Sequence, residues 1–327
     1  MSYRGKLVSA LVSTSLFLLS TYTAVAQDLS NPNALAALCL GASKCVSASI
    51  TVPKVQSTPS WMSPDVGAAW SAGYKGQGVT ITVVDDFSSA SRFSGNLGLG
   101  TQYQRHGEWT REESSLLAPR ATMKSKDFST SSSVPLSYGL NVLNLSYGMY
   151  AKAGYGVGNI GWSNEESSII AYATNGNAVI SKAAGNDAIP VGSVNSSGQQ
   201  DYLDLALIGK QSAIFVGSLN NNGTTTNGAS MAWYSNTAGS NTSVQSHFLV
   251  VGVSGSTTGL YGTSFAAPII SGYAAIIGSK FPQATPTDIT NRLLNTARTD
   301  TLLKYTPAIY GKGEASLSRA LAPSSIR

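Results

Sequence analysis

Four polar residues have the types and positions that nucleophilic catalysis requires. A serine nucleophile needs a base within hydrogen-bond reach, a carboxylate that orients this base, and donors that stabilise the oxyanion. Ser264 begins an almost wholly apolar stretch, and Asp85 directly follows an apolar run rich in valine. The chain contains only two histidines, His106 and His247, so a histidine base must be one of these. Asn186 follows another apolar run, and its side-chain amide could donate to an oxyanion.

Each of these residues also fits an ordinary structural position. Ser264 would serve equally well as the N-cap of a helix, and Asp85 as the first residue of a turn. The asparagine is equally typical of a turn. Asp86, one residue further along, is a rival for the role of the carboxylate. His247 directly precedes an apolar segment, where a structural histidine is common, so His106 is the preferred base.

The segments that carry these residues predict an alternation of strands and helices. Short apolar runs predict strands over 79–84, 140–145, 178–183, 212–218 and 248–253. We expect helices over 64–73, 106–118, 164–175, 264–280 and 286–297, with N-caps at Ser63, Ser163 and Thr285. The stretches rich in Ser, Asn and Gly are expected to be loops: 87–105, 190–211 and 220–246. This alternation predicts an α/β fold, in which helices cover both faces of a mostly parallel central sheet.

Taken in chain order, four motifs resemble those of the subtilisin-like serine peptidases, or subtilases. The motifs are Asp85 after two valines, His106-Gly107, Ala183-Ala184-Gly185-Asn186, and Gly262-Thr263-Ser264-Phe265-Ala266-Ala267-Pro268. The serine motif is the most specific of them, and the resemblance covers roughly residues 63–323. The segment Tyr310-Gly311-Lys312-Gly313 is similar to the ending of passenger domains in autotransporter subtilases of Gram-negative bacteria. The resemblance implies a subtilisin-like fold.

The resemblance also implies a role for each candidate residue. Ser264 would attack the peptide carbonyl, His106 would take the serine proton, and Asp85 would orient the imidazole. Asn186 and the backbone N–H of the serine would hold the oxyanion. The substrate would pair as an added strand with Ser146, Tyr147 and Gly148. A second substrate-binding segment comprises Ala183, Ala184 and Gly185, whose small size implies an open pocket wall that admits a large apolar side chain.

Two features depart from the family pattern. Asp85 is followed by Asp86 and Phe87, where a small residue and a glycine are usual. The helix of the histidine is bulky and charged, with Glu108 and Trp109 in its first turn, so its packing against the serine helix must differ. These departures leave an alternative function open, a catalytically weak peptide-binding protein on a subtilase scaffold.

The N-terminal region is typical of a secreted protein. Residues 1–26 are predicted to be a signal peptide, with a positive start, an apolar run and small residues before a cleavage site at Gln27. Residues 27–60 form a leader in which Cys39 and Cys45 suit a short-loop disulfide. The remaining residues, 61–327, are predicted to be the catalytic domain.

Composition and motif order narrow the function further. A net charge of +5 without a basic cluster argues against nucleic-acid binding, and no segment after the signal peptide resembles a membrane span. The order acid, histidine, serine argues against esterases and lipases, which place the serine first. We therefore expect a secreted or periplasmic, monomeric serine endopeptidase that acts on polypeptides through an acyl-enzyme intermediate. Catalysis would require no cofactor; calcium could bind, but no loop has a convincing ligand spacing.

Overall fold

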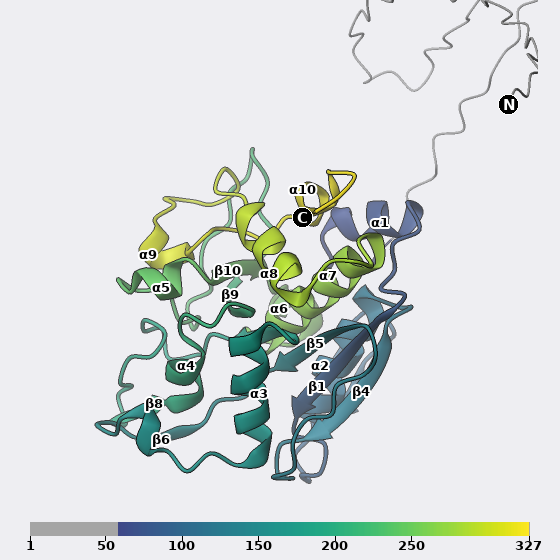
Figure 1. Cartoon of the computed structure of the whole chain (residues 1–327). Helices are drawn as coiled ribbons and strands as arrows, with labels where there is room; N and C mark the ends of the chain where they lie inside the picture. The colour runs from purple at the N-terminus through teal and green to yellow at the C-terminus, as the bar shows by residue number, and fades with distance from the viewer. Residues whose placement is uncertain (1–57, 327) are drawn as a thin grey trace, which may run out of the picture. The chain divides into compact units, whose positions relative to one another are not determined.

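A six-stranded parallel sheet forms the centre of the part of the chain that the structure describes, residues 58–326 (Figure 1). In this computed structural model the strand order is β10-β9-β7-β5-β1-β4, and all neighbouring pairs are parallel. The strands are β1 (Val79–Asp85), β4 (Thr122–Asp127), β5 (Leu140–Leu145), β7 (Val179–Ala183), β9 (Ala213–Leu219) and β10 (Phe248–Gly252). The predicted mostly parallel sheet is thereby confirmed.

The N-terminal predictions concern residues that the structure leaves undescribed. The signal peptide 1–26, nearly all of the leader 27–60, Cys39 and Cys45 lie outside the described residues. Cleavage before Gln27 and the disulfide therefore stay predictions. Within residues 58–326, the helices are too short or too polar to cross a bilayer.

The sheet separates two hydrophobic cores, which explains the unbroken apolar sequence of its central strands. All 7 residues of β1 and all 7 of β9 are buried. Successive side chains of a strand point to opposite faces, so Val83 packs into one core and the adjacent Val84 into the other. Strands that are buried on both faces need apolar residues at every position.

Helices cover both faces of the sheet, as predicted (Figure 1). One core contains side chains of α1 (Pro64–Ser71), α2 (His106–Leu117), α7 (Ala267–Lys280), α8 (Pro286–Asn295) and α10 (Leu317–Leu321). The other core contains side chains of α3 (Asn164–Asn175), α4 (Tyr202–Leu207), α5 (Thr242–Gln245) and α9 (Pro307–Tyr310). The predicted caps are confirmed, because the hydroxyls of Ser63, Ser163 and Thr285 each accept a backbone N–H of the first helical turn.

The helix expected over 264–280 is divided, and this part of the prediction was wrong. Thr263–Phe265 form a 3-10 turn, η2, and the α-helix begins at Ala267. The cause lies in the sequence. An α-helical bond to the carbonyl of Ser264 would need the N–H of residue 268, which is a proline and has none.

Several stretches that were expected to be loops contain short elements. There β2 (Phe93–Gly95) pairs antiparallel with β3 (Gln102–Gln104). The strand β8 (Gln199–Asp201) pairs antiparallel with β6 (Tyr150–Lys152), which lies outside the expected loops. The helices α4 and α5 and the outer strand β4 were also missed. The sequence of β4 is polar because one of its edges faces solvent at the border of the sheet, where lysine is common.

Candidate active site

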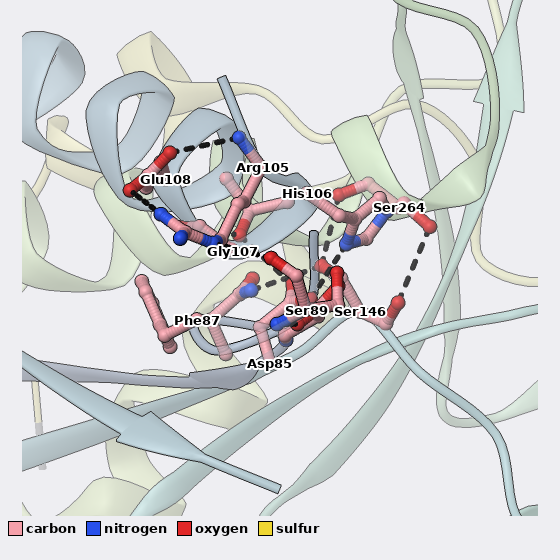
Figure 2. A network of polar contacts seen from close by, with 12 residues as sticks. Asp85, Phe87, Ser89, Arg105, His106, Gly107, Glu108, Ser146 and Ser264 are labelled. Atoms are coloured by element: carbon pink, nitrogen blue, oxygen red, sulfur yellow. Dashed lines mark hydrogen bonds and ion pairs between the residues drawn. The ribbon is translucent and has the colours of Figure 1, made fainter. Parts of the chain in front are cut away.

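A carboxylate and an imidazole meet at the carboxyl end of β1 (Figure 2). Nδ1 of His106 lies 2.6 Å from Oδ1 of Asp85, whose side chain is only 1% exposed. Two further donors hold the carboxylate: the hydroxyl of Thr110 donates to Oδ2 at 2.9 Å, and the N–H of Asp86 donates to Oδ1 at 2.7 Å. The fold thus brings together two of the predicted site residues that are 21 positions apart.

The rival carboxylate, Asp86, has a different set of partners. Its Oδ1 accepts the backbone N–H groups of Ser88 and Ser89, and its Oδ2 accepts the hydroxyl of Ser89. Burial acts to raise the pKa of Asp86, but these hydrogen bonds outweigh it and lower the pKa. Asp86 therefore stabilises the turn after β1, while Asp85 contacts the histidine.

His106 is the first residue of α2, and the glycine after it allows the close approach to β1. The N–H of Gly107 donates to the carbonyl of Asp86 at 3.0 Å, and a Cβ on this glycine would lie 2.6 Å from the same oxygen. The imidazole packs among aromatic rings, with centroids 6.3 Å from Phe93 and 5.8 Å from Phe265. The ring of the second histidine, His247, hydrogen-bonds with Ser246 and with the carbonyl of Ser243 just before β10, away from Asp85.

Ser264 lies in η2, where Ser146 holds it from the end of β5. The hydroxyl of Ser146 donates to the carbonyl of Ser264 at 2.9 Å, and thereby satisfies the oxygen that Pro268 leaves without a helical partner. The amide of Asn144 donates in turn to the Ser146 hydroxyl at 2.9 Å. The Ser264 hydroxyl donates to the carbonyl of Ser146 at 3.3 Å, and the imidazole of His106 lies beside it (Figure 2).

Asn186 is held by the residue that precedes the serine. Its Oδ1 accepts the N–H of Thr263 at 2.8 Å and the hydroxyl of the same residue at 3.0 Å. The N–H of Gly185 donates to this hydroxyl at 3.0 Å. These two bonds hold the side-chain amide in place, and a Cβ on Gly262 would lie 3.4 Å from its Nδ2.

The two predicted substrate-binding segments follow adjacent strands. Ser146, Tyr147 and Gly148 continue from β5. Ala183 is the last residue of β7, and Ala184 and Gly185 follow it. These strands pair directly, with Leu145 opposite Lys182. The fold therefore places both segments at the same edge of the sheet as Asp85.

Two supporting residues were missed at the sequence level. Thr110 lies one helical turn after the histidine and is fully buried, and this spacing was the only available signal. Asn236, which is 4% exposed, donates its amide to the carbonyl of Ala184 and its N–H to that of Gly185. Its position in a long polar stretch gave no signal, because its partners lie about fifty residues away.

The bulky histidine helix packs against α7 through two small hydroxyl residues and through Leu117, which faces Gly272. Thr110 and Ser114 are fully buried, and the hydroxyl of Ser114 donates to the carbonyl of Pro268 at 3.3 Å. Trp109 instead packs beside β2, where its indole N–H donates to the carbonyl of Phe93 at 3.1 Å. The largest residue of the helix therefore lies on the side that contacts β2.

Metal binding gains no support from the described part of the chain. Among residues 58–326, no three side chains of His, Cys, Asp or Glu are grouped to hold an ion. A calcium site therefore stays unassigned.

Comparison with known proteins identifies relatives of this chain. The profile of the subtilase family matches residues 110–313, a span that includes Asn186 and Ser264 and begins after His106. The subtilisin-like protease SBT2.6 of Arabidopsis thaliana is 37% identical over an alignment of 83 residues, and the match covers 20% of this chain and 10% of that protein. The chain thus matches a small part of this curated relative.

Two solved structures have a similar fold, each with a TM-score of 0.52. The prenylagaramide maturation protease PagA is 18% identical, and the match covers 79% of this chain and 98% of PagA. A lanthipeptide protease is 16% identical, and the match covers 76% of this chain and 89% of the other. At these identities the likeness concerns the fold.

Proposed function

Because this chain belongs to the subtilase family of serine peptidases, we propose that it is an endopeptidase with Ser264 as nucleophile, His106 as base and Asp85 as orienting carboxylate. The bond of 2.6 Å between Nδ1 of His106 and the buried Asp85 is the observation that carries this proposal. An ionised carboxylate only accepts hydrogen bonds, so Nδ1 carries the proton. Nε2 then keeps its lone pair and can act as the base.

The reaction proceeds in two balanced steps. The Ser264 hydroxyl turns from the carbonyl of Ser146 toward Nε2 of His106 and attacks the peptide carbonyl carbon as its proton passes to Nε2. Nδ2 of Asn186 donates to the resulting oxyanion. The C–N bond breaks, the amine leaves with the proton from Nε2, and an acyl ester remains on the serine. Water then repeats the sequence and releases the acid.

A fluorophosphonate tests this proposal directly. Intact-mass analysis and peptide mapping should find one adduct on Ser264, formed by displacement of fluoride. Ser264→Ala should take up no label and should lose cleavage of casein, while its melting temperature stays that of the wild type. Equal cleavage by the wild type and Ser264→Ala would contradict the proposal.

A second candidate, a peptide-binding protein without turnover, is favoured by one observation. The Ser264 hydroxyl donates to the carbonyl of Ser146. If the serine stays there, it receives no help from the base. Folded protein that binds peptides but takes up no fluorophosphonate would support this alternative.

We further propose that the chain is exported and acts as a monomer without a required cofactor. The support for export is the sequence of residues 1–26 and the low share of charged residues, 11%. N-terminal sequencing of the exported protein should begin at Gln27. An N-terminus at Met1 in the medium would contradict cleavage of a signal peptide.

A further inference from the structure

The position of the scissile bond defines where the adjacent substrate side chain must lie. This inference rests on the proposed function, in which the carbonyl carbon lies between the Ser264 hydroxyl and Asn186. The acyl residue is extended and pairs with Ser146–Gly148. Its side chain therefore projects into the gap between Gly148 and Gly185, the facing members of the two substrate-binding segments.

The side chain of Tyr150 spans this gap. A Cβ on Gly148 would lie 2.6 Å from Cε2 of Tyr150, and a Cβ on Gly185 would lie 3.6 Å from the hydroxyl of the same tyrosine. The ring thus contacts one wall with its edge and approaches the other with its hydroxyl. The tyrosine thus lies beside the wall that the small residues Ala183, Ala184 and Gly185 were expected to leave open.

The backbone of Tyr150 is held by the pairing of β6 with β8, while the residue is 44% exposed. Tyr150 pairs with Asp201 in the β6–β8 ladder, and the N–H of Met149 donates to Oδ1 of Asp201 at 2.9 Å. The buried Lys182 holds Asp201 in turn, because its Nζ lies 3.1 Å from Oδ2 of Asp201. The same Nζ lies 2.9 Å from Oδ1 of Asp204. These three side chains are between 2% and 5% exposed.

We propose that Tyr150 is a specificity-determining residue that restricts the acyl side of the scissile bond to small side chains such as those of glycine, alanine and serine. Shape excludes larger ones, because an aromatic substrate side chain would need the volume that the tyrosine ring occupies. The tyrosine side chain reaches both segments, with Asp201 beside it at Gly148 and Asn236 beside it at Gly185.

Peptide p-nitroanilides that differ only at the acyl residue test this inference. The wild type should cleave the alanine peptide at least about tenfold more efficiently than the phenylalanine peptide, as judged by kcat/KM. Tyr150→Ala should raise kcat/KM for the phenylalanine peptide about tenfold or more, and should change that for alanine by less than about threefold. Tyr150→Phe keeps the ring and should keep the wild-type preference.

A matched control and a binding measurement separate this inference from the proposed function. Tyr138→Ala removes a fully exposed tyrosine and should leave kcat/KM unchanged for both peptides. Fluorescence polarisation of labelled alanine and phenylalanine peptides with Ser264→Ala measures their binding affinity without turnover. If this binding depends on Tyr150 while the wild type is inactive, the inference stands and the proposed function fails.

Three results would overturn the inference. The first is an equal preference for both peptides in the wild type and in Tyr150→Ala. The second is a preference of the wild type for a lysine peptide, because the ring would then move aside and Asp201 would bind the cation. The third is neither cleavage nor binding of any peptide, because the assigned substrate strand would then be wrong.

Discussion

The carboxylate of Asp85 depends on three donors that come from different parts of the chain. His106 and Thr110 belong to α2, and the N–H of Asp86 belongs to the turn after β1. A buried carboxylate with several donors is held in one orientation, and it holds the imidazole in turn. Thr110 is therefore a positioning residue, because it acts on the histidine through Asp85.

Thr110→Val should lower kcat about tenfold and leave KM nearly unchanged. Valine has nearly the same shape as threonine, but the buried carboxylate loses one donor, and a hydrogen bond to a charged group is worth about 1.5–3 kcal/mol. Thr110→Ser keeps the hydroxyl and should restore most of kcat. Steady-state kinetics on one peptide check both variants, and an equal loss in Thr110→Ser would show that packing alone matters.

The catalytic candidates were accessible from sequence to different degrees. Ser264 and Asn186 lie in short motifs, so local spacing identified them. Thr110 and Tyr150 act through contacts with Asp85 and Gly185, which depend on how α2 crosses the sheet and how β6 pairs with β8. Neither arrangement has a local sequence signal, so the residues that modify the site had to come from the structure.

At the level of elements, α2 carries an unusual buried carboxyl group. Glu113 is 3% exposed, and its Oε2 has no hydrogen-bond partner among the described residues. Burial raises the pKa of Glu113 well above the ordinary value of 4.5. The side chain is therefore neutral over a pH range in which an unfolded chain would ionise it.

Replacement of Glu113 should stabilise the protein increasingly as pH rises. Below pH 4.5 both states are protonated, and the group costs nothing through ionisation. Above pH 4.5 only the unfolded state ionises, so the stability of the wild type falls by about 1.4 kcal/mol per pH unit until the raised folded-state pKa is reached. Glu113→Met removes this loss and keeps a similar volume.

Thermal unfolding at pH 4, 6 and 8 measures this effect, with Ser264→Ala as the background to prevent self-cleavage. The gain in melting temperature of Glu113→Met should grow from pH 4 to pH 8. Glu113→Gln, which keeps a buried polar group, should show the same dependence on pH with a smaller gain at each value. Parallel curves for all three proteins would contradict a neutral buried Glu113.

The long elements were predictable, and the short ones were not. The strand β5 and the helix α3 have the expected bounds. An apolar run defines β5 locally, and a clear N-cap and C-cap define α3. The strands β6 and β8 have three residues each and are held by pairing partners about fifty positions away. Such a segment has no hydrophobic period of its own, so only the folded chain defines it.

For the described domain as a whole, the two sides of the site belong to different helices. His106 begins α2, and Ser264 lies just before α7. The distance between base and nucleophile therefore depends on how closely these helices pack. Gly272 of α7 sets this distance, because a Cβ there would lie 2.6 Å from Cβ of Leu117 and 3.1 Å from its Cδ1.

Gly272→Ala should impair both stability and catalysis. The Cβ of Leu117 is fixed to the backbone of α2, so the helices must separate, at a cost of about 1–3 kcal/mol. Because this shift moves His106 relative to Ser264, kcat should fall at a temperature where the variant is fully folded.

Gly278→Ala is the matched control on the same helix. Its Cβ would meet the side-chain ends of Leu140 and Val79, at the amino ends of β5 and β1 and therefore away from the site. We expect Gly278→Ala to lower the melting temperature and leave kcat unchanged; an equal kcat in both variants would show that helix spacing does not set the catalytic geometry.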